Sequence, residues 1–111
     1  MTLPRLAVTM GDPAGIGPEI TAGALADFPS DKADIVIVGD TARLRQAAEL
    51  IAVEITHVIR QTGDATDHLP FGEVSAEAGK ASSGYVQMAV RLALAGEVDG
   101  IVTAPDRKSV V

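Results

Sequence analysis

Three glycines and an aspartate are concentrated in residues 9–20, the stretch TMGDPAGIGPEI. Glycine permits positive φ and a close approach of the backbone to a ligand, so Gly11, Gly15 and Gly17 could expose main-chain amides. The free N–H groups of a following helix can hold an anion or a polarised oxygen, and Asp12 could orient a hydroxyl or a cationic group. The stretch therefore predicts a small-molecule site, although a purely structural turn also uses glycines in this way.

The spacing of these glycines differs from the two common nucleotide-binding patterns. The Rossmann fingerprint is G-x-G-x-x-G, whereas the glycines here follow G-x-x-x-G-x-G. A P-loop ends in Gly-Lys-Ser or Gly-Lys-Thr, but this stretch ends in Gly17, Pro18 and Glu19. We therefore do not expect the phosphate cradle of a standard mononucleotide site.

The elements that must position this stretch alternate between strands and helices. Short apolar runs rich in β-branched residues predict buried strands, and apolar residues at helical spacing predict helices. The predicted strands cover residues 5–10, 35–39, 53–59 and 100–105. The predicted helices cover residues 18–26, residues 42–51 and a segment from Ser82 or Ser83 to Ala95, with mostly loop over residues 60–80.

Local signals support the helix ends and one helix face. Pro18 suits the first turn of its helix, Asp40 or Thr41 can cap the second helix, and Gly96 can end the third. The residues predicted to form one apolar stripe on the third helix are Val86, Ala89, Val90, Ala93 and Leu94.

This order of elements predicts the α/β class, with a parallel or mostly parallel sheet and helices on both faces. Ligands in such sheets bind outside the carboxyl ends of the strands. GDPAGIGPE follows the first predicted strand, and TAPDRK follows the last. Both unusual segments are therefore expected at the same edge of the sheet.

Composition excludes several classes of function. The chain has no cysteine, which excludes disulfides, thiolate catalysis and cysteine zinc sites. Its net charge is −6 and its basic residues are scattered, so we expect no nucleic-acid partner. No apolar run approaches the roughly 20 residues that span a bilayer, and the start does not resemble a signal peptide. We therefore expect a cytoplasmic protein without a membrane partner.

The stretch MGDPAGIGPEI resembles the N-terminal signature of the 4-hydroxythreonine-4-phosphate dehydrogenase family of vitamin B6 biosynthesis. A second segment, GEVDGIVTAPDRK, resembles the family segment that contains TAP and a lysine three residues beyond it. The shorter GD…GIGPE core is also similar to that of the isocitrate and isopropylmalate dehydrogenases. The resemblance covers essentially the whole chain, and it implies an isocitrate/isopropylmalate dehydrogenase-like fold.

The resemblance also implies an activity and its cofactors. NAD would accept a hydride from the secondary alcohol of a phosphorylated hydroxy acid, and the β-keto product would decarboxylate. A divalent metal would polarise the reacting oxygen. The family's metal-ligating histidines lie beyond the point where this chain ends, and neither His57 nor His68 has a ligand-like context, so we assign no metal ligand.

The resemblance carries over to seven residues that would bind substrate or cofactor, and no catalytic residue is assigned. Gly11, Asp12, Gly15 and Gly17 would shape the loop at the active cleft. At the other segment, Thr103 would hydrogen-bond substrate or cofactor, Pro105 would hold the turn and Lys108 would attract phosphate.

The chain is expected to be a single α/β domain over residues 1–111, the N-terminal part of a longer homodimeric enzyme, and to be inactive alone. Two alternatives stay open. One is a non-catalytic ligand-binding or assembly domain. The other is a family member that acts on another phosphorylated sugar acid or on a dihydrodiol.

Overall fold

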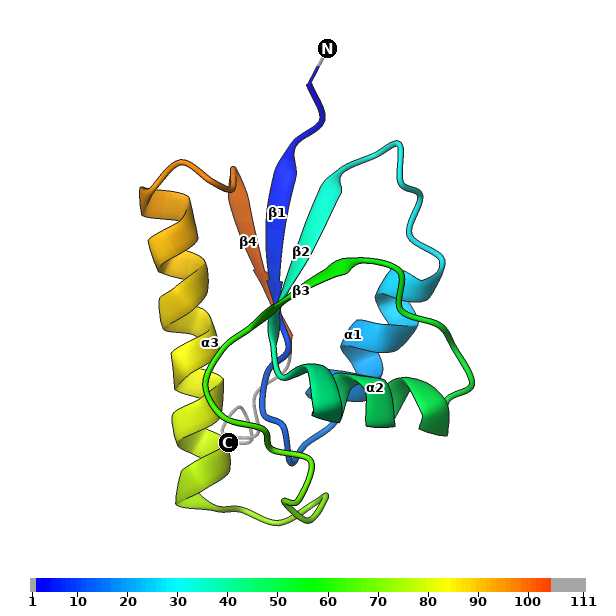
Figure 1. Ribbon diagram of the computed structural model, residues 1–111, viewed down its shortest axis with the longest axis vertical. Helices are drawn as coiled ribbons and strands as arrows, with labels where there is room; N and C mark the ends of the chain where they lie inside the picture. The colour runs from blue at the N-terminus through cyan, green and yellow to red at the C-terminus, as the bar shows by residue number, and fades with distance from the viewer. Residues whose placement is uncertain (1, 105–111) are drawn as a thin grey trace, which may run out of the picture.

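Four parallel strands form one sheet in the order β3-β2-β1-β4 (Figure 1). The computed structural model describes residues 2–104. The strands are β1 (Arg5–Thr9), β2 (Asp34–Gly39), β3 (Val58–Gln61) and β4 (Gly100–Thr103). The helices are α1 (Gly17–Ala26), α2 (Thr41–Leu50) and α3 (Ala76–Leu94).

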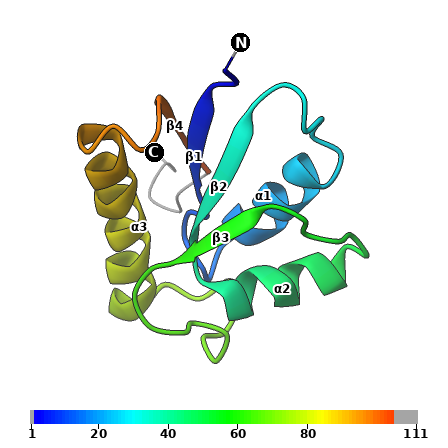
Figure 2. The same ribbon diagram turned by 45° about the horizontal axis from the view of Figure 1, so that its top comes forward.

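The helices cover both faces of the sheet. Figures 1 and 2 show α1 and α2 on one side of the strands and α3 on the other. Apolar side chains from these layers meet in one core cluster, which includes Ile37 of β2, Leu44 of α2 and Tyr85 of α3. The predicted α/β class, with a parallel sheet between helices, is therefore confirmed.

Several helix ends lie where local sequence signals placed them. Asp40 caps α2, because its carboxylate accepts hydrogen bonds from the amides of Ala42 and Arg43. Pro18 occupies the first turn of α1. Gly96 follows the end of α3 with a φ of +76°, a left-handed conformation that glycine adopts without strain.

The third helix differs from its prediction in its start and in its buried face. It begins at Ala76 with Ser75 as its cap, and not at Ser82 or Ser83. Within the predicted stripe Ala89 is buried, whereas Val86, Val90 and Leu94 are 41%, 42% and 84% exposed. The buried face instead follows Ala78, Ser82, Tyr85, Ala89 and Leu92. Tyr85, Ala89 and Leu92 of this face belong to the core cluster, so tertiary packing, and not the positions of the apolar residues alone, sets which face of the helix is buried.

The third strand is also displaced from its prediction. The alternating segment 53–59 predicted a strand, but β3 covers Val58–Gln61. After α2 the chain turns at Ala52, whose φ is +58°, and the amide of Val53 bonds back to the carbonyl of Ala48. Val53 and Ile55 then pack against the core cluster without joining the sheet. Their apolar alternation therefore reflects burial and not strand pairing.

Gly39, the last residue of β2, is required by close packing. A Cβ atom added there would lie 2.6 Å from the Cβ of Met10 and 3.2 Å from its Sδ. We expect Gly39→Ala to lower the free energy of unfolding by about 1–3 kcal/mol, because β2 or Met10 must move. Urea denaturation followed by circular dichroism measures this change.

Gly79 provides the matched control for that substitution. It lies inside α3, and an added Cβ would have no neighbour within 4 Å. Gly79→Ala should raise the free energy of unfolding by about 0.5–1 kcal/mol, because alanine favours the helix. The two changes need not be equal in size, but a stabilising Gly39→Ala would contradict the packing seen at Met10.

The helices within residues 2–104 can be compared with the length and hydropathy of a membrane-spanning helix. None of α1, α2 and α3 combines the length and the apolar character that crossing a membrane requires.

Candidate functional site

Both motif segments leave the sheet at the same edge, where the strand order changes direction. From β1 the chain proceeds outward to β2 and β3, and it then returns past β1 to β4. Such a switch point opens a crevice at the carboxyl ends of parallel strands. Thr9 pairs with Thr103 in the register of β1 and β4, and the amide of Ala104 donates to the carbonyl of Thr9 at 3.2 Å. Thr103 therefore lies beside the start of the glycine-rich loop, residues 10–16.

The glycine-rich loop is shaped by its own hydrogen bonds. Gly11 has a φ of +81°, which an L side chain tolerates poorly. The Asp12 carboxylate accepts from the amide of Ala14 at 2.8 Å, and the Asp12 carbonyl accepts from the amide of Gly15 at 3.0 Å. Asp12 is itself buried. Its side chain thus holds the turn together.

Gly15 and Gly17 differ from Gly11 because neither has a positive φ. An added Cβ at Gly15 would make ordinary contacts with Asp12, the nearest at 3.5 Å. Gly17 begins α1, whose cap residue is Ile16 and whose first amides receive no side-chain cap within the described range. The first amides of any α-helix lack intrahelical acceptors, and they attract anions. The start of α1 can therefore offer donors to a ligand at this edge.

A buried acidic residue organises the neighbouring strand end. Besides capping α2, Asp40 accepts from the amide and the hydroxyl of Thr66, at 2.6 and 2.7 Å, and from the Gln61 side chain at 3.2 Å. Burial alone would raise the pKa of Asp40, but these hydrogen bonds and that of the Arg43 amide together lower it. Asp40 therefore stays ionised and ties the loop after β3 to the start of α2.

Sequence reasoning missed one buried cation at this edge. Arg43 is completely buried within α2 and lies among the buried positions of that helix, with Leu44, Ala47 and Ala48. Its Nε donates to the carbonyl of Pro13 in the glycine-rich loop at 2.7 Å. An arginine on the core-facing side of a predicted helix was the available signal, since arginine is almost never fully buried without partners.

Tyr85 is the protein's one tyrosine. It is buried, and Asp40 and Arg43 lie close enough for their charges to act on its hydroxyl. Burial raises the pKa of its hydroxyl to about 12, because the phenolate would lose its hydration. An alkaline titration that follows tyrosinate absorbance should show ionisation near pH 12, or only as the protein unfolds. A midpoint near the usual value of 10.0 in protein that is still folded by circular dichroism would contradict this burial.

The same shift has a consequence for stability in alkali. The folded-state pKa of Tyr85 lies above its unfolded value, so the neutral phenol stabilises the folded state. This contribution is complete below the unfolded value of 10.0 and is lost as the pH rises through about 12.

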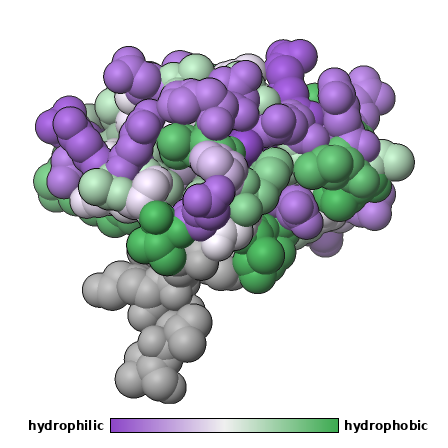
Figure 3. Space-filling model, turned by 90° about the horizontal axis from the view of Figure 1, so that it is seen from below, coloured by the Kyte–Doolittle hydropathy of each residue, from purple (hydrophilic) through white to green (hydrophobic). Residues whose placement is uncertain are grey.

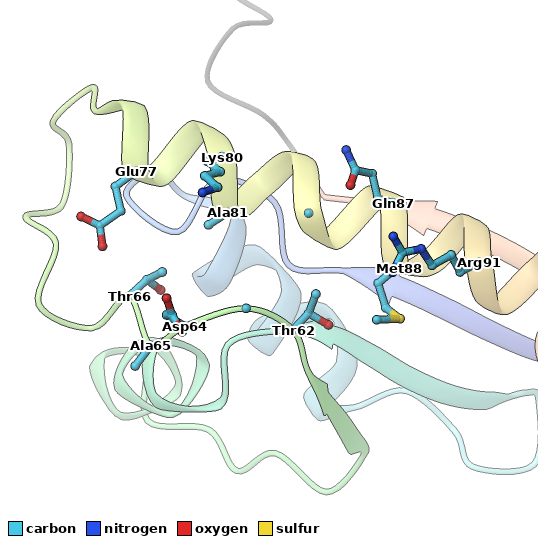
Figure 4. A pocket seen from close by; sticks show the side chains of 12 residues that line it. Thr62, Asp64, Ala65, Thr66, Glu77, Lys80, Ala81, Gln87, Met88 and Arg91 are labelled. Atoms are coloured by element: carbon cyan, nitrogen blue, oxygen red, sulfur yellow. The ribbon is translucent and has the colours of Figure 1, made fainter.

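Two cavities lie beside the sheet, the first of them close to its carboxyl edge. One of about 580 Å³ lies between α3 and the loop after β3, where Glu77 and Lys80 face Asp64 and Thr66 (Figure 4). The other, of about 230 Å³, is mostly apolar and is lined by Thr103 with residues of α1, β1 and β2. Viewed onto this edge, the surface mixes hydrophilic side chains with separate hydrophobic patches (Figure 3).

The predicted residues lie unequally around these cavities. Gly11, Asp12, Gly15 and Gly17 line neither of the two, whereas Thr103 lines the smaller one. The switch point therefore brings Thr103 and the glycine-rich loop to one edge, but of these only Thr103 lines one of the two cavities.

Two predicted site residues stay predictions, and the two histidines make contacts within the protein. Pro105 and Lys108 lie outside the described residues. His57 contacts the carbonyl of Leu25 at 3.1 Å, and His68 pairs with Glu77 at 3.0 Å on the surface. Within residues 2–104 no three His, Cys, Asp or Glu side chains are grouped to hold a metal ion. The described donor set therefore does not fit the implied divalent metal.

Comparison with known proteins identifies the family. The family model described as "Pyridoxal phosphate biosynthetic protein PdxA" matches residues 31–111. A D-threonate 4-phosphate dehydrogenase of Bordetella bronchiseptica is 41% identical over 126 aligned positions, which cover 96% of this chain and 36% of that protein. A 4-hydroxythreonine-4-phosphate dehydrogenase of Thermosynechococcus vestitus is 38% identical over 112 positions, which cover 94% of this chain and 33% of that protein.

A solved structure agrees with these relatives. The crystal structure of a 4-hydroxythreonine-4-phosphate dehydrogenase from Burkholderia phymatum superposes with a TM-score of 0.90 at 34% identity. The match covers 97% of this chain and 38% of that one, so the chain spans only a little over a third of the length of that structure. The matched relatives are dehydrogenases by name, and the family match extends over most of the sequence. The chain therefore belongs to the PdxA family of pyridoxal phosphate biosynthetic proteins.

Proposed function

We propose that the whole protein is an NAD-dependent dehydrogenase of the 4-hydroxythreonine-4-phosphate type, and that this chain forms one wall of its active cleft. The observation that carries the proposal is the meeting of the glycine-rich loop and the end of β4 at the switch point of the sheet. The dehydrogenases that match this chain along nearly all its length support the same reaction class.

The proposed reaction oxidises a secondary alcohol beside a carboxylate-bearing carbon. A hydride leaves the carbinol carbon for the nicotinamide ring, and the hydroxyl proton leaves to a base. The resulting β-keto acid can then release CO₂. NAD, when bound, supplies the hydride acceptor. Because residues 2–104 contain no group of side chains that forms a metal site, the part proposed for them is binding and orientation.

The residues of this chain would bind and orient the substrate or cofactor. The amides at the start of α1, such as that of Gly17, would donate to a phosphate or carboxylate oxygen. Thr103 would donate a hydrogen bond from the neighbouring strand end. Asp12 would act indirectly, because its carboxylate fixes the turn that presents those amides. Pro105 and Lys108 keep their proposed roles in the turn and in phosphate attraction.

A phosphorylated sugar acid is the second candidate substrate. The Bordetella bronchiseptica relative, at 41% identity, is named for D-threonate 4-phosphate, which carries a hydroxyl where 4-hydroxythreonine 4-phosphate carries an amino group. The carbon framework and the reacting alcohol are otherwise shared. One cleft could therefore serve either substrate, and the group at the second carbon decides between them.

A chimeric enzyme tests the proposal. Residues 1–111 would replace the equivalent third of the Bordetella bronchiseptica enzyme, and NADH formation would be measured with a divalent metal and with each of the two substrates. We expect turnover, and the preferred substrate distinguishes the two candidates. The unmodified relative is the control. A chimera that folds and binds phosphate but turns over neither substrate would contradict the proposal and favour a non-catalytic binding domain.

The isolated chain should form no NADH under the same conditions. Turnover by these 111 residues alone would show that they contain a complete active site. We further propose that the whole protein acts in the cytoplasm as a homodimer, as the resemblance implies. Light scattering of the whole protein would test the oligomeric state, and a monomer would contradict it.

A further inference from the structure

We propose that Arg43 is a positioning residue of the ligand site, because it joins the glycine-rich loop to a second loop, residues 66–72, and makes the two loops one ordered unit. The inference rests on the proposed function only where it assigns a ligand to the glycine-rich loop. The coupling between the loops is a property of this chain alone.

One guanidinium group contacts both loops. The Nε of Arg43 donates to the carbonyl of Pro13 at 2.7 Å. Its Nη1 donates to the carbonyl of Asp67 at 3.4 Å, and its Nη2 donates to the carbonyl of Leu69. The three acceptors are therefore backbone atoms from two segments that lie more than fifty residues apart.

Two further contacts fix the orientation of that group. The guanidinium carbon lies 3.9 Å from the ring centroid of Phe71, and Nη1 also donates to the Gln46 side chain at 2.8 Å. A planar fork can satisfy several acceptors while stacking on an aromatic ring. A lysine ammonium at the same place is a single donor centre, and it cannot reach all of these partners together.

The two loops also meet directly. The amide of Gly72 donates to the carbonyl of Ala14 at 2.6 Å. Ala14 and Leu69 pack with Ala78 in a small buried cluster of their own, separate from the main core. The beginning of the second loop is held by Asp40, which binds the amide and hydroxyl of Thr66. Displacing either loop would therefore disturb the other.

The burial of Arg43 needs a reason beyond stability. Burial lowers the pKa of its guanidinium, while the nearby Asp67 and Asp40 act in the opposite direction. Well-packed apolar residues often stabilise such positions as well as buried charges do. What an apolar side chain cannot supply is a set of directed donors to carbonyls of both loops. The geometry thus assigns Arg43 the task of fixing the loop that leads into the first amides of α1, such as that of Gly17.

The test replaces Arg43 with lysine, which keeps the charge and removes the fork. Arg45→Lys on the exposed side of the same helix is the matched control. Amide hydrogen exchange of the loops and an NMR titration with inorganic phosphate are measured in both variants. For Arg43→Lys we expect exchange to accelerate about tenfold at both Gly15 and Gly72, with the β1 and β2 amides unchanged. The phosphate dissociation constant at the loop should rise about tenfold, and Arg45→Lys should change neither quantity.

Phe71→Leu gives a second test that keeps every donor of Arg43. It removes the ring stack on a partly exposed residue, so we expect a smaller acceleration, about threefold, again in both loops together. Unchanged exchange in Arg43→Lys, or acceleration in one loop alone, would overturn the inference. If both loops accelerate but phosphate never shifts their amides in the parent protein, the coupling stands and the ligand assigned by the proposed function is wrong.

Discussion

Asp40→Asn should lower the free energy of unfolding by about 3–5 kcal/mol, the largest loss that we expect from one substitution in this chain. The carboxylate of Asp40 accepts from three backbone amides, the Thr66 hydroxyl and the Gln61 side chain. An asparagine amide group retains one accepting oxygen, and its NH₂ would face donors. Since small domains have only about 5–15 kcal/mol of stability, the loss is readily seen in urea denaturation.

The control residue is Asp34, at the opposite end of β2 from Asp40. Asp34 begins β2 and is exposed, so Asp34→Asn should change the free energy of unfolding by about 0.5 kcal/mol or less. Similar losses for the two variants would show that the hydrogen bonds of Asp40 contribute little to stability.

The pH dependence of stability provides an independent measurement. Although burial acts to raise the pKa of Asp40, its hydrogen bonds hold that pKa below the usual value of 3.8. A lowered folded-state pKa means that the stabilisation is complete above the unfolded value and is lost as the pH falls through the folded one. Stability of the parent protein should therefore decline below about pH 4, and Asp40→Asn should show a shallower decline. Parallel curves for the two proteins would argue against this assignment.

Gly11→Val should reduce kcat/KM of the chimeric enzyme by about a hundredfold. Gly11 has a φ of +81° and is followed directly by the turn that Asp12 closes. A β-branched residue adopts this conformation only with strain, about 1–3 kcal/mol, or else the loop moves. Movement of the loop would displace the first amides of α1, which we propose to bind the substrate. NADH formation, normalised to the folded fraction, measures the effect.

Gly96→Val separates the loss of activity from backbone strain. Gly96 also has a positive φ, +76°, but it follows α3 at the opposite edge of the sheet, before β4 begins. The variant should be destabilised by a similar amount and should keep near-parent activity in its folded fraction. If both variants lose activity alike, Gly11 has no specific part in the site.

The α/β architecture and several helix ends could be predicted because their causes are local. The carboxylate of Asp40 accepts hydrogen bonds from the amides two and three residues later in the chain. Gly96, directly after α3, adopts a positive φ that glycine tolerates without strain. The alternation of strands and helices then placed both motif segments at one edge, and the pairing of Thr9 with Thr103 agrees with that placement.

Other features depended on contacts between distant parts of the chain. The buried face of α3 includes Tyr85, whereas Val90 is exposed. Packing against the rest of the fold decides which face of the helix is buried, and the hydropathy of its residues alone does not. The segment around Val53 and Ile55 was apolar enough for a strand, but it packs against the core while β3 forms further along. Gly39 is needed only because Met10 lies against it.

The sequence by itself determined the class of fold and the placement of the glycine-rich loop and the end of β4 at one edge of the sheet. Only the tertiary structure decided that Arg43 binds Pro13, thirty residues away, and that residues 66–72 belong with the glycine-rich loop. The physical reason is the range of the interactions involved. Caps and turns are set by neighbours within a few residues, whereas a buried guanidinium takes its partners from whichever carbonyls the folded chain brings within hydrogen-bonding distance.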